Sequence, residues 1–170
     1  MTDRATAAPA SPQSLPVYGQ PAPREAARQH IVIMQSALAC APFVGNLGQP
    51  VVLNADNADF VQRLDTALDT ATVGSHVYLM GDEAFIWEMH AKAKKAGLLD
   101  DEIDMTLSAA GARRVYCVHC GLTQIGGPAA ELQCAGCGIR LDVREHFSKR
   151  LGAYLGVCQN ADQPYAGARP

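Results

Sequence analysis

Four cysteines are spaced so that they could hold a single metal ion. They form two Cys-x-x-Cys pairs within one stretch of the chain: Cys117, Cys120, Cys134 and Cys137. Two pairs supply the four thiolates that a tetrahedral Zn²⁺ needs at about 2.3 Å from each sulfur. Gly121 and Gly138 follow the pairs, and glycine enters left-handed backbone conformations without steric cost. Because such a turn lets backbone N–H groups point at sulfur, we predict one metal site with these four cysteines as ligands.

The alternatives to structural zinc are disulfides, unrelated thiols and a single redox iron. Disulfide-rich small domains normally carry an export signal, and the N-terminal residues here lack its apolar run. Iron is the closer alternative, because rubredoxins use similar glycine-bearing pairs. In rubredoxins, however, the pairs lie much further apart and aromatic residues shield the iron, whereas the spacer 122–133 contains no aromatic residue. We therefore expect zinc.

No catalytic and no cofactor-binding residue is predicted elsewhere. The histidines form no metal triad by spacing: His30, His76, His90, His119 and His146. His119 lies inside the first cysteine pair, but four thiolates are already available, so we do not expect it to bind the metal. Cys40 and Cys158 are expected to be incidental or buried thiols. A closed four-thiolate site also leaves no position for water or substrate.

Composition limits the class of protein. The 170 residues are 48% hydrophobic, which allows one moderate domain or two small ones. The formal net charge of −3 argues against nucleic acid as a partner, because phosphate recognition needs a dominant basic face. No run approaches the roughly 20 apolar residues of a membrane span. We expect a cytoplasmic protein that binds neither nucleic acid nor membrane.

The chain divides into four predicted parts. Residues 1–29 are rich in proline and small residues and are expected to form a disordered or extended arm, in which Val17-Tyr18-Gly19 could grip a surface. An α/β half-domain over 30–112 follows. The remaining parts are the four-cysteine zinc ribbon over 113–144 and a C-terminal docking segment with a tail over 145–170.

Alternating strands and helices define the half-domain. Apolar or alternating runs predict strands at 31–34, 77–80 and within 98–108, with a further short strand at 51–53 and a loop over 36–50. One helix is predicted from Asp56 or Asn57 to Gly74, and a second from its cap Asp82 to Gly97. The order predicts an α/β fold, a small parallel βαβ-type sheet of three to four strands.

Each predicted helix has one apolar stripe. The first stripe comprises Phe60, Val61, Leu64, Ala67, Leu68 and Ala71; the second comprises Phe85, Ile86, Met89, Ala93 and Ala96. Both stripes have the spacing of a helix that packs on a sheet.

The C-terminal part begins with a strand. Alternation over 139–143 predicts the returning strand of the ribbon. Beyond it, Phe147, Leu151, Tyr154 and Leu155 have the spacing of one helical face, although Gly152 and Gly156 would weaken such a helix. The segment needs a surface on which to fold, either its own ribbon or a partner subunit.

The middle of the chain resembles the last part of the nicotinamide-binding domain of ferredoxin-reductase-like flavoproteins. The resemblance rests on the strand 77–80, the helix after Asp82 and the Ala96-Gly97 turn. Met80 and Asp82 replace the Cys and Pro of that family, and no Gly-x-Gly-x-x-Gly loop occurs. Carboxylates also stand where a nucleotide phosphate needs a free helix N-terminus. We infer a half-domain that has lost its cofactor.

Taken together, the motifs resemble the small A subunit of bacterial dimethylamine monooxygenases. The resemblance rests on Pro-Val-Tyr-Gly at 16–19, the paired cysteine knuckles and, above all, the motif from His146 to Gly156. It implies methylamine metabolism: an NAD(P)H- and O₂-dependent complex that converts dimethylamine to methylamine and formaldehyde. It also implies haem, FMN and a [2Fe–2S] cluster on companion subunits.

We therefore expect a hetero-oligomer in which this chain is a non-catalytic structural or assembly subunit with one structural zinc. The main alternative is a rubredoxin-like iron subunit that transfers electrons within the same complex. A nucleic-acid-binding zinc ribbon is a third hypothesis, but the basic residues are too few to favour it.

Overall fold

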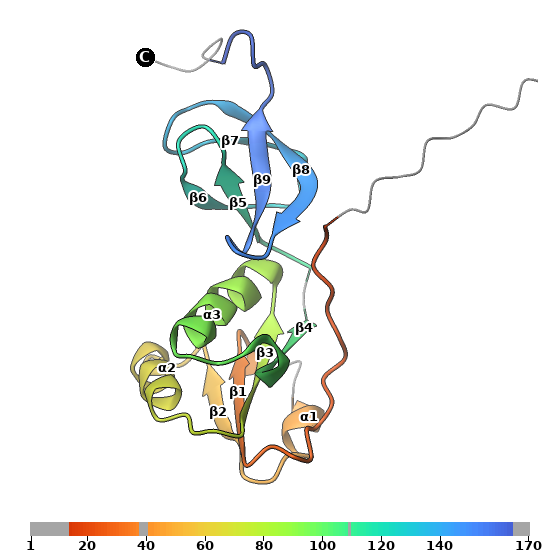
Figure 1. The fold of residues 1–170 in the computed structure, drawn as a ribbon, viewed down its shortest axis with the longest axis vertical. Coiled ribbons are helices and arrows are strands. Elements are labelled where there is room, and N and C mark those ends of the chain that lie inside the picture. Colours follow the sequence, from red (N-terminus) through yellow and green to blue (C-terminus); the bar gives the residue numbers. More distant parts are fainter. Residues whose placement is uncertain (1–13, 38–40, 109, 165–170) are drawn as a thin grey trace, which may run out of the picture.

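The computed structural model describes residues 14–37, 41–108 and 110–164, which form two sheets arranged end to end (Figure 1). The predictions for 1–13, Cys40 and 165–170 lie outside these residues. The helices of the described residues all lack the length and the apolar composition of a membrane-spanning segment.

The first sheet is parallel, as predicted. Its strands are β1 (Gln29–Met34), β2 (Val51–Asn54), β3 (Ser75–Gly81) and β4 (Ile103–Leu107), in the order β2-β1-β3-β4. Ile31 pairs with Val51 on one side and with Val77 on the other. All residues of β3 are buried, which explains the continuous apolar run at 77–80.

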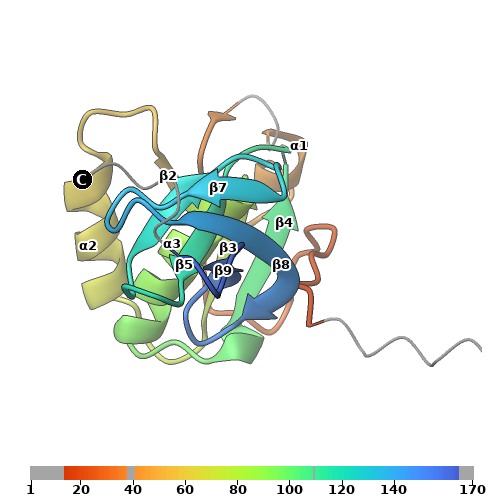
Figure 2. The ribbon, with the colours of Figure 1, turned by 90° about the horizontal axis from the view of Figure 1, so that it is seen from above.

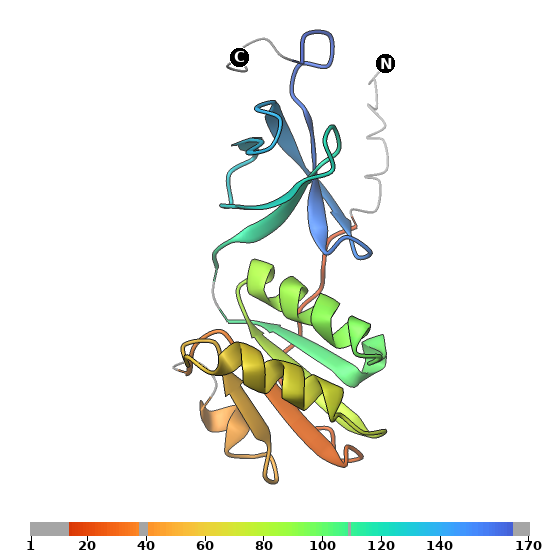
Figure 3. The same ribbon diagram turned by 90° about the vertical axis from the view of Figure 1, so that its left-hand side faces the viewer.

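Helices cover both faces of this sheet. Helices α2 (Phe60–Asp69) and α3 (Glu83–Lys95) lie on one face, where Leu64 and Ile86 join the core around Ile31 (Figure 3). The short helix α1 (Ala41–Val44) covers the other face and falls inside the predicted loop over 36–50, which was therefore wrong at this point. A 3₁₀ turn, η2 (Asp100–Glu102), precedes β4.

The helix boundaries were predicted unequally well. The prediction for α3 is confirmed, since Asp82 Oδ1 accepts a hydrogen bond from the backbone N–H of Phe85 at 2.9 Å and Gly97 has φ of +102°. For α2 the predicted ends were wrong. The helix begins after Asp59, whose side chain makes no capping bond, and it ends at Asp69 with Thr70 as the cap.

Both helices depart from their predicted stripes. Ala71 lies beyond the end of α2 at Asp69, and Ala96 is exposed at the C-cap of α3. Val61 of α2 is 62% exposed instead of facing the sheet. In α3 the buried Trp87 was missed because it lies off the stripe that faces the first sheet. It packs instead on the second sheet, in a cluster with Val115 and Phe147.

The second sheet contains five strands in the order β6-β5-β9-β8-β7. They are β5 (Arg113–Cys117), β6 (Thr123–Gly126), β7 (Glu131–Gln133), β8 (Arg140–Ser148) and β9 (Ala153–Cys158). Seen along the long axis, this sheet lies over α3 (Figure 2). Strand β8 continues through residue 145, so the predicted ribbon and docking segment share one sheet.

The helical spacing seen in the C-terminal segment was misleading. Residues 140–158 form the β8–β9 hairpin, and its pairing places Phe147 opposite Tyr154 with ring centroids 5.1 Å apart. Gly152 has φ of +58° at the turn, and a Cβ on Gly156 would lie 2.9 Å from Leu141. Both glycines are therefore required by a hairpin that folds on its own chain.

Glu83 joins the two sheets and the N-terminal arm. One of its carboxylate oxygens accepts hydrogen bonds from the Tyr18 hydroxyl at 2.9 Å and the Tyr154 hydroxyl at 3.0 Å. The Tyr18 hydroxyl also accepts from Trp87 Nε1 at 2.9 Å, and Gly19 N–H donates to the Met105 carbonyl. The predicted contact of Val17-Tyr18-Gly19 with a surface is therefore made by Tyr18 and Gly19, whereas Val17 is 86% exposed, and the surface belongs to the same chain.

We predict that Tyr18→Phe destabilises the folded chain by about 1–3 kcal/mol, because it removes one donor to Glu83 and leaves Trp87 Nε1 without its acceptor. Urea unfolding would measure this. Tyr116→Phe is the matched control, since the Tyr116 hydroxyl has no hydrogen-bond partner among the described residues. Equal stability of the two variants would contradict the role of Tyr18.

A second prediction concerns alkaline pH. Burial, followed by the charge of Glu83 and its hydrogen bond, raises the pKa of Tyr154 from 10.0 to about 12. Because the folded pKa exceeds the unfolded one, the neutral hydroxyl stabilises the fold fully below about pH 10, and this stabilisation is lost as the pH rises toward 12. The free energy of unfolding should therefore fall across this range, and less steeply in Tyr154→Phe. Parallel slopes in urea titrations would refute this assignment.

Candidate metal centre

The two Cys-x-x-Cys-Gly stretches fold into the same turn. Gly121 N–H donates to the Cys117 carbonyl and Gly138 N–H to the Cys134 carbonyl, each at 2.9 Å. Both glycines are left-handed, with φ of +78° and +72°. A side chain would strain either position, so the sequence requirement for glycine after each pair has a direct backbone cause.

These turns bring the four predicted ligands together. All four Sγ atoms lie within 4.8 Å of one another. Cys117 Sγ is 3.8 Å from Cys137 Sγ, and Cys120 Sγ is 3.6 Å from Cys134 Sγ. Four sulfurs about 2.3 Å from a central ion at tetrahedral angles would be separated by about 3.8 Å. The donor set and its dimensions therefore fit a tetrahedral metal ion, and zinc and iron fit equally well.

Backbone N–H groups point at the sulfurs of Cys117 and Cys134, the first cysteine of each pair. Burial raises the pKa of Cys117 to about 12, against the lowering effect of N–H groups from Cys120 and His119. At Cys134 burial also acts to raise the pKa, but N–H groups from Cys137 and Gly136, together with hydrogen bonds from the Cys120 and Cys137 side chains, outweigh it and lower the pKa to about 7. Four thiolates packed this closely repel one another, so they can all be deprotonated together only around a cation.

Each pair supplies one inner and one outer sulfur. Cys117 and Cys134 are buried in a core with Ile139 and Leu141, whereas Cys120 is exposed and Cys137 half-buried. Within 14–37, 41–108 and 110–164, no other group of three or more His, Cys, Asp or Glu side chains brings its ligating atoms close enough together to hold a metal ion. His119 is not a member of the group.

The end of the first sheet where a nucleotide phosphate would bind is filled by the chain itself. Asp82 N–H donates to Gln35 Oε1 at 2.8 Å, and Gln35 Nε2 donates back to Asp82 Oδ2 at 3.1 Å. Ala84 N–H donates to the Ala112 carbonyl at 3.0 Å. The N–H groups of Asp82, Ala84 and Phe85 therefore have internal partners, at the helix N-terminus that binds phosphate in nucleotide-binding folds.

Comparison with known proteins finds relatives along both parts of the chain. The family described as dimethylamine monooxygenase subunit DmmA-like matches through its N-terminal domain at 43–103 and its C-terminal domain at 114–157. The chain is 45% identical over 175 residues to the heme-dependent oxidative N-demethylase delta subunit of Ectopseudomonas mendocina (strain ymp), which covers 97% of this chain and 99% of that subunit. No solved structure gives a significant match.

We predict that Cys134→Ser releases the metal and unfolds the second sheet, because metal binding and folding are coupled in small modules of this kind. Elemental analysis and circular dichroism would measure the two effects. Cys158→Ser is the matched control: its Sγ lies outside the cluster and donates to the Asn160 carbonyl at 3.2 Å. Retention of one metal ion per chain in the Cys134 variant would show that the four-thiolate assignment is wrong.

Proposed function

We propose, since the chain belongs to the DmmA-like family of dimethylamine monooxygenase subunits, that it is a non-catalytic structural and assembly subunit of a haem-dependent complex. That complex would demethylate dimethylamine oxidatively to methylamine and formaldehyde. The near full-length similarity to a subunit of a heme-dependent oxidative N-demethylase carries the proposal. The resemblance to the small A subunit of such enzymes is confirmed by the family match.

In this proposal Cys117, Cys120, Cys134 and Cys137 hold a structural zinc. Zinc bound by four thiolates has no open coordination position and supplies no redox step. Its contribution would be to connect the turn between β5 and β6 with the turn between β7 and β8. The support for this role is that the inner sulfurs are part of the core of the second sheet.

The reaction itself would be carried out by companion subunits that hold haem, FMN and a [2Fe–2S] cluster. Two features of this chain support that division. Its thiolate set is committed to one small site, and the N-terminus of α3 is occupied by Asp82 and Ala112 instead of being free for a cofactor phosphate.

Docking to the companions would use the surface around the outer sulfurs. Val118 and Leu122 flank Cys120 in the sequence and are 47% and 38% exposed. Leu122 and Cys120 Sγ both lie close to Gly136, so they share one surface. Exposed apolar side chains such as Leu122, next to an exposed thiolate, are typical of a surface that is covered in a complex.

An electron-transfer role with iron in place of zinc is the second candidate. The exposure of Cys120 favours it, because an ion near the surface is within reach of a redox partner. Iron would give visible absorbance that bleaches with dithionite, whereas zinc would leave the purified chain colourless. Elemental analysis on the same sample would identify the ion.

We predict that Val118→Asp reduces co-purification of this chain with its companion subunits without changing its metal content or stability, because a charge in a desolvated interface is costly. Co-expression followed by affinity purification would measure it. Val73→Asp is the control, since Val73 is also exposed, at 92%, but lies in the loop after α2. Failure of even the unchanged chain to assemble with haem and flavin subunits would refute the proposed function.

A further inference from the structure

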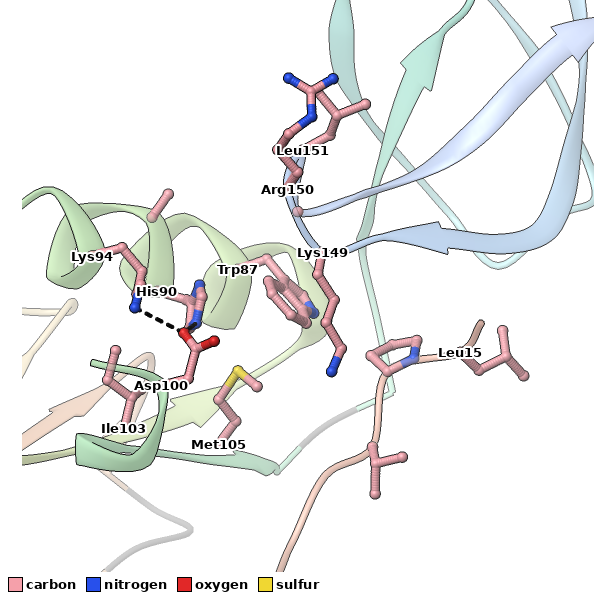
Figure 4. A pocket seen from close by; sticks show the side chains of 14 residues that line it. Leu15, Trp87, His90, Lys94, Asp100, Ile103, Met105, Lys149, Arg150 and Leu151 are labelled. Atoms are coloured by element: carbon pink, nitrogen blue, oxygen red, sulfur yellow. Dashed lines mark ion pairs between the residues drawn. The ribbon is translucent and has the colours of Figure 1, made fainter. Parts of the chain in front are cut away.

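A cavity of about 620 Å³ lies between the two halves of the chain (Figure 4). Its walls come from the N-terminal arm, from α3 and the adjoining η2 and β4, and from the β8–β9 turn. This size is within the range of small-molecule sites. Because neither half encloses the space alone, it exists only when Glu83 and its tyrosines hold the halves together.

Positive charge exceeds negative charge around this cavity. Asp100 is the one carboxylate of its lining, and Lys94 Nζ already lies 2.9 Å from it. His90 Nε2 is 3.6 Å from the same carboxylate, but burial first, and the charges of Lys94 and Lys149 as well, lower the pKa of His90 despite Asp100. At neutral pH His90 therefore adds no charge, and Lys149 and Arg150 are the other cations of the lining.

Lys149 projects into the cavity from the β8–β9 turn, whereas the neighbouring Arg150 points away from it (Figure 4). No carboxylate among the described residues lies within ion-pair distance of Lys149. Lys149 is an exposed residue, and its charge acts on the Asp100 side chain, which is itself 80% exposed: it contributes to the lowered pKa of Asp100, after the hydrogen bond from Lys94 and the charges of Lys94 and His90.

Packing contacts explain the conformation of the β8–β9 turn, but they do not explain why its residue 149 is a lysine. Phe147 lies with its ring centroid 4.5 Å from that of Trp87, and a Cβ on Gly152 would contact Trp87 at 3.5 Å. Leu151 N–H donates to the Ser148 carbonyl at 3.1 Å and closes the turn. These contacts hold the backbone of the turn against α3 and do not involve the Lys149 side chain. The Lys149 ammonium group at the cavity is therefore available to bind a ligand.

We propose that this cavity binds a small organic anion, a carboxylate or a phosphate monoester, with its charged group on Lys149 and its apolar part against Leu15, Met105 and Leu151. An ammonium group gives a charge-assisted hydrogen bond to either anion. The apolar lining rejects a fully hydrated inorganic ion and favours a ligand with a hydrocarbon or ring portion. The site is independent of the metal centre.

Trp87 gives a direct test, because it lines the cavity and is the single tryptophan of the chain. The full chain would be titrated with benzoate, phenyl phosphate and the neutral analogue benzamide. Calorimetry would measure binding, and Trp87 fluorescence would locate it. We expect saturable binding of one or both anions, and at least about tenfold weaker binding of benzamide. Binding of only one anion would identify the charged group of the ligand as a carboxylate or a phosphate, and binding of both would show that the site accepts either.

Three variants sharpen the test. Lys149→Ala should weaken anion binding about tenfold, whereas Asp100→Asn should strengthen it by removing the competing carboxylate. Lys95→Ala is the matched control, because Lys95 is an exposed cation of α3 outside the lining and its loss should change nothing. Unchanged circular dichroism would show that each variant is folded.

Several results would overturn the proposal. These are the absence of binding by either anion up to about 10 mM, equal binding by the Lys149→Ala chain, and benzamide binding as tight as that of benzoate. The last two would show that charge at Lys149 does not recognise the ligand.

Discussion

A single carboxylate, that of Glu83, determines how the parts of this chain sit together. It accepts a hydrogen bond from Tyr18 of the N-terminal arm and another from Tyr154 of the second sheet, while Glu83 itself begins a helix of the first sheet. A half-buried carboxylate must have such donors, since desolvation without them is costly. This shared oxygen, together with the packing of Trp87 on Val115 and Phe147, orients the second sheet relative to α3 and shapes the cavity between the halves.

Local patterns were sufficient for the metal centre and for most of the first sheet. The spacing of the cysteines and the glycine after each pair determine a turn within a few residues, so the four sulfurs could be grouped without knowledge of the fold. The buried strands 31–34 and 77–80 were equally clear, because continuous apolar runs of that length suit a sheet covered on both faces. In each case the residues that form the sequence pattern are the same residues, or near neighbours of the residues, whose structure the pattern predicts.

The errors arise where distant segments decide the structure. The spacing of Phe147 and Tyr154 fits one face of a helix. It also fits a hairpin in which a tight turn at Gly152 places the two residues opposite each other, and only the pairing of β9 with β5 selects the hairpin over the helix. The Tyr18–Glu83 contact spans 65 residues, so no periodicity could indicate it. Trp87 carried a usable signal: a large aromatic off the apolar stripe of α3 indicates that a second face of that helix is buried.

The second sheet and the filled phosphate position have one structural cause. To reach β5 from β4, the chain must pass the N-terminus of α3, and there the Ala112 carbonyl accepts from Ala84 N–H. A Cβ on Gly111 would lie 3.2 Å from Asp82, so the linker also passes closely over the helix cap. A phosphate would compete with this linker for the same N–H groups. Joining the second sheet to the first at this point therefore uses N–H donors that the N-terminus of such a helix would otherwise offer to a phosphate.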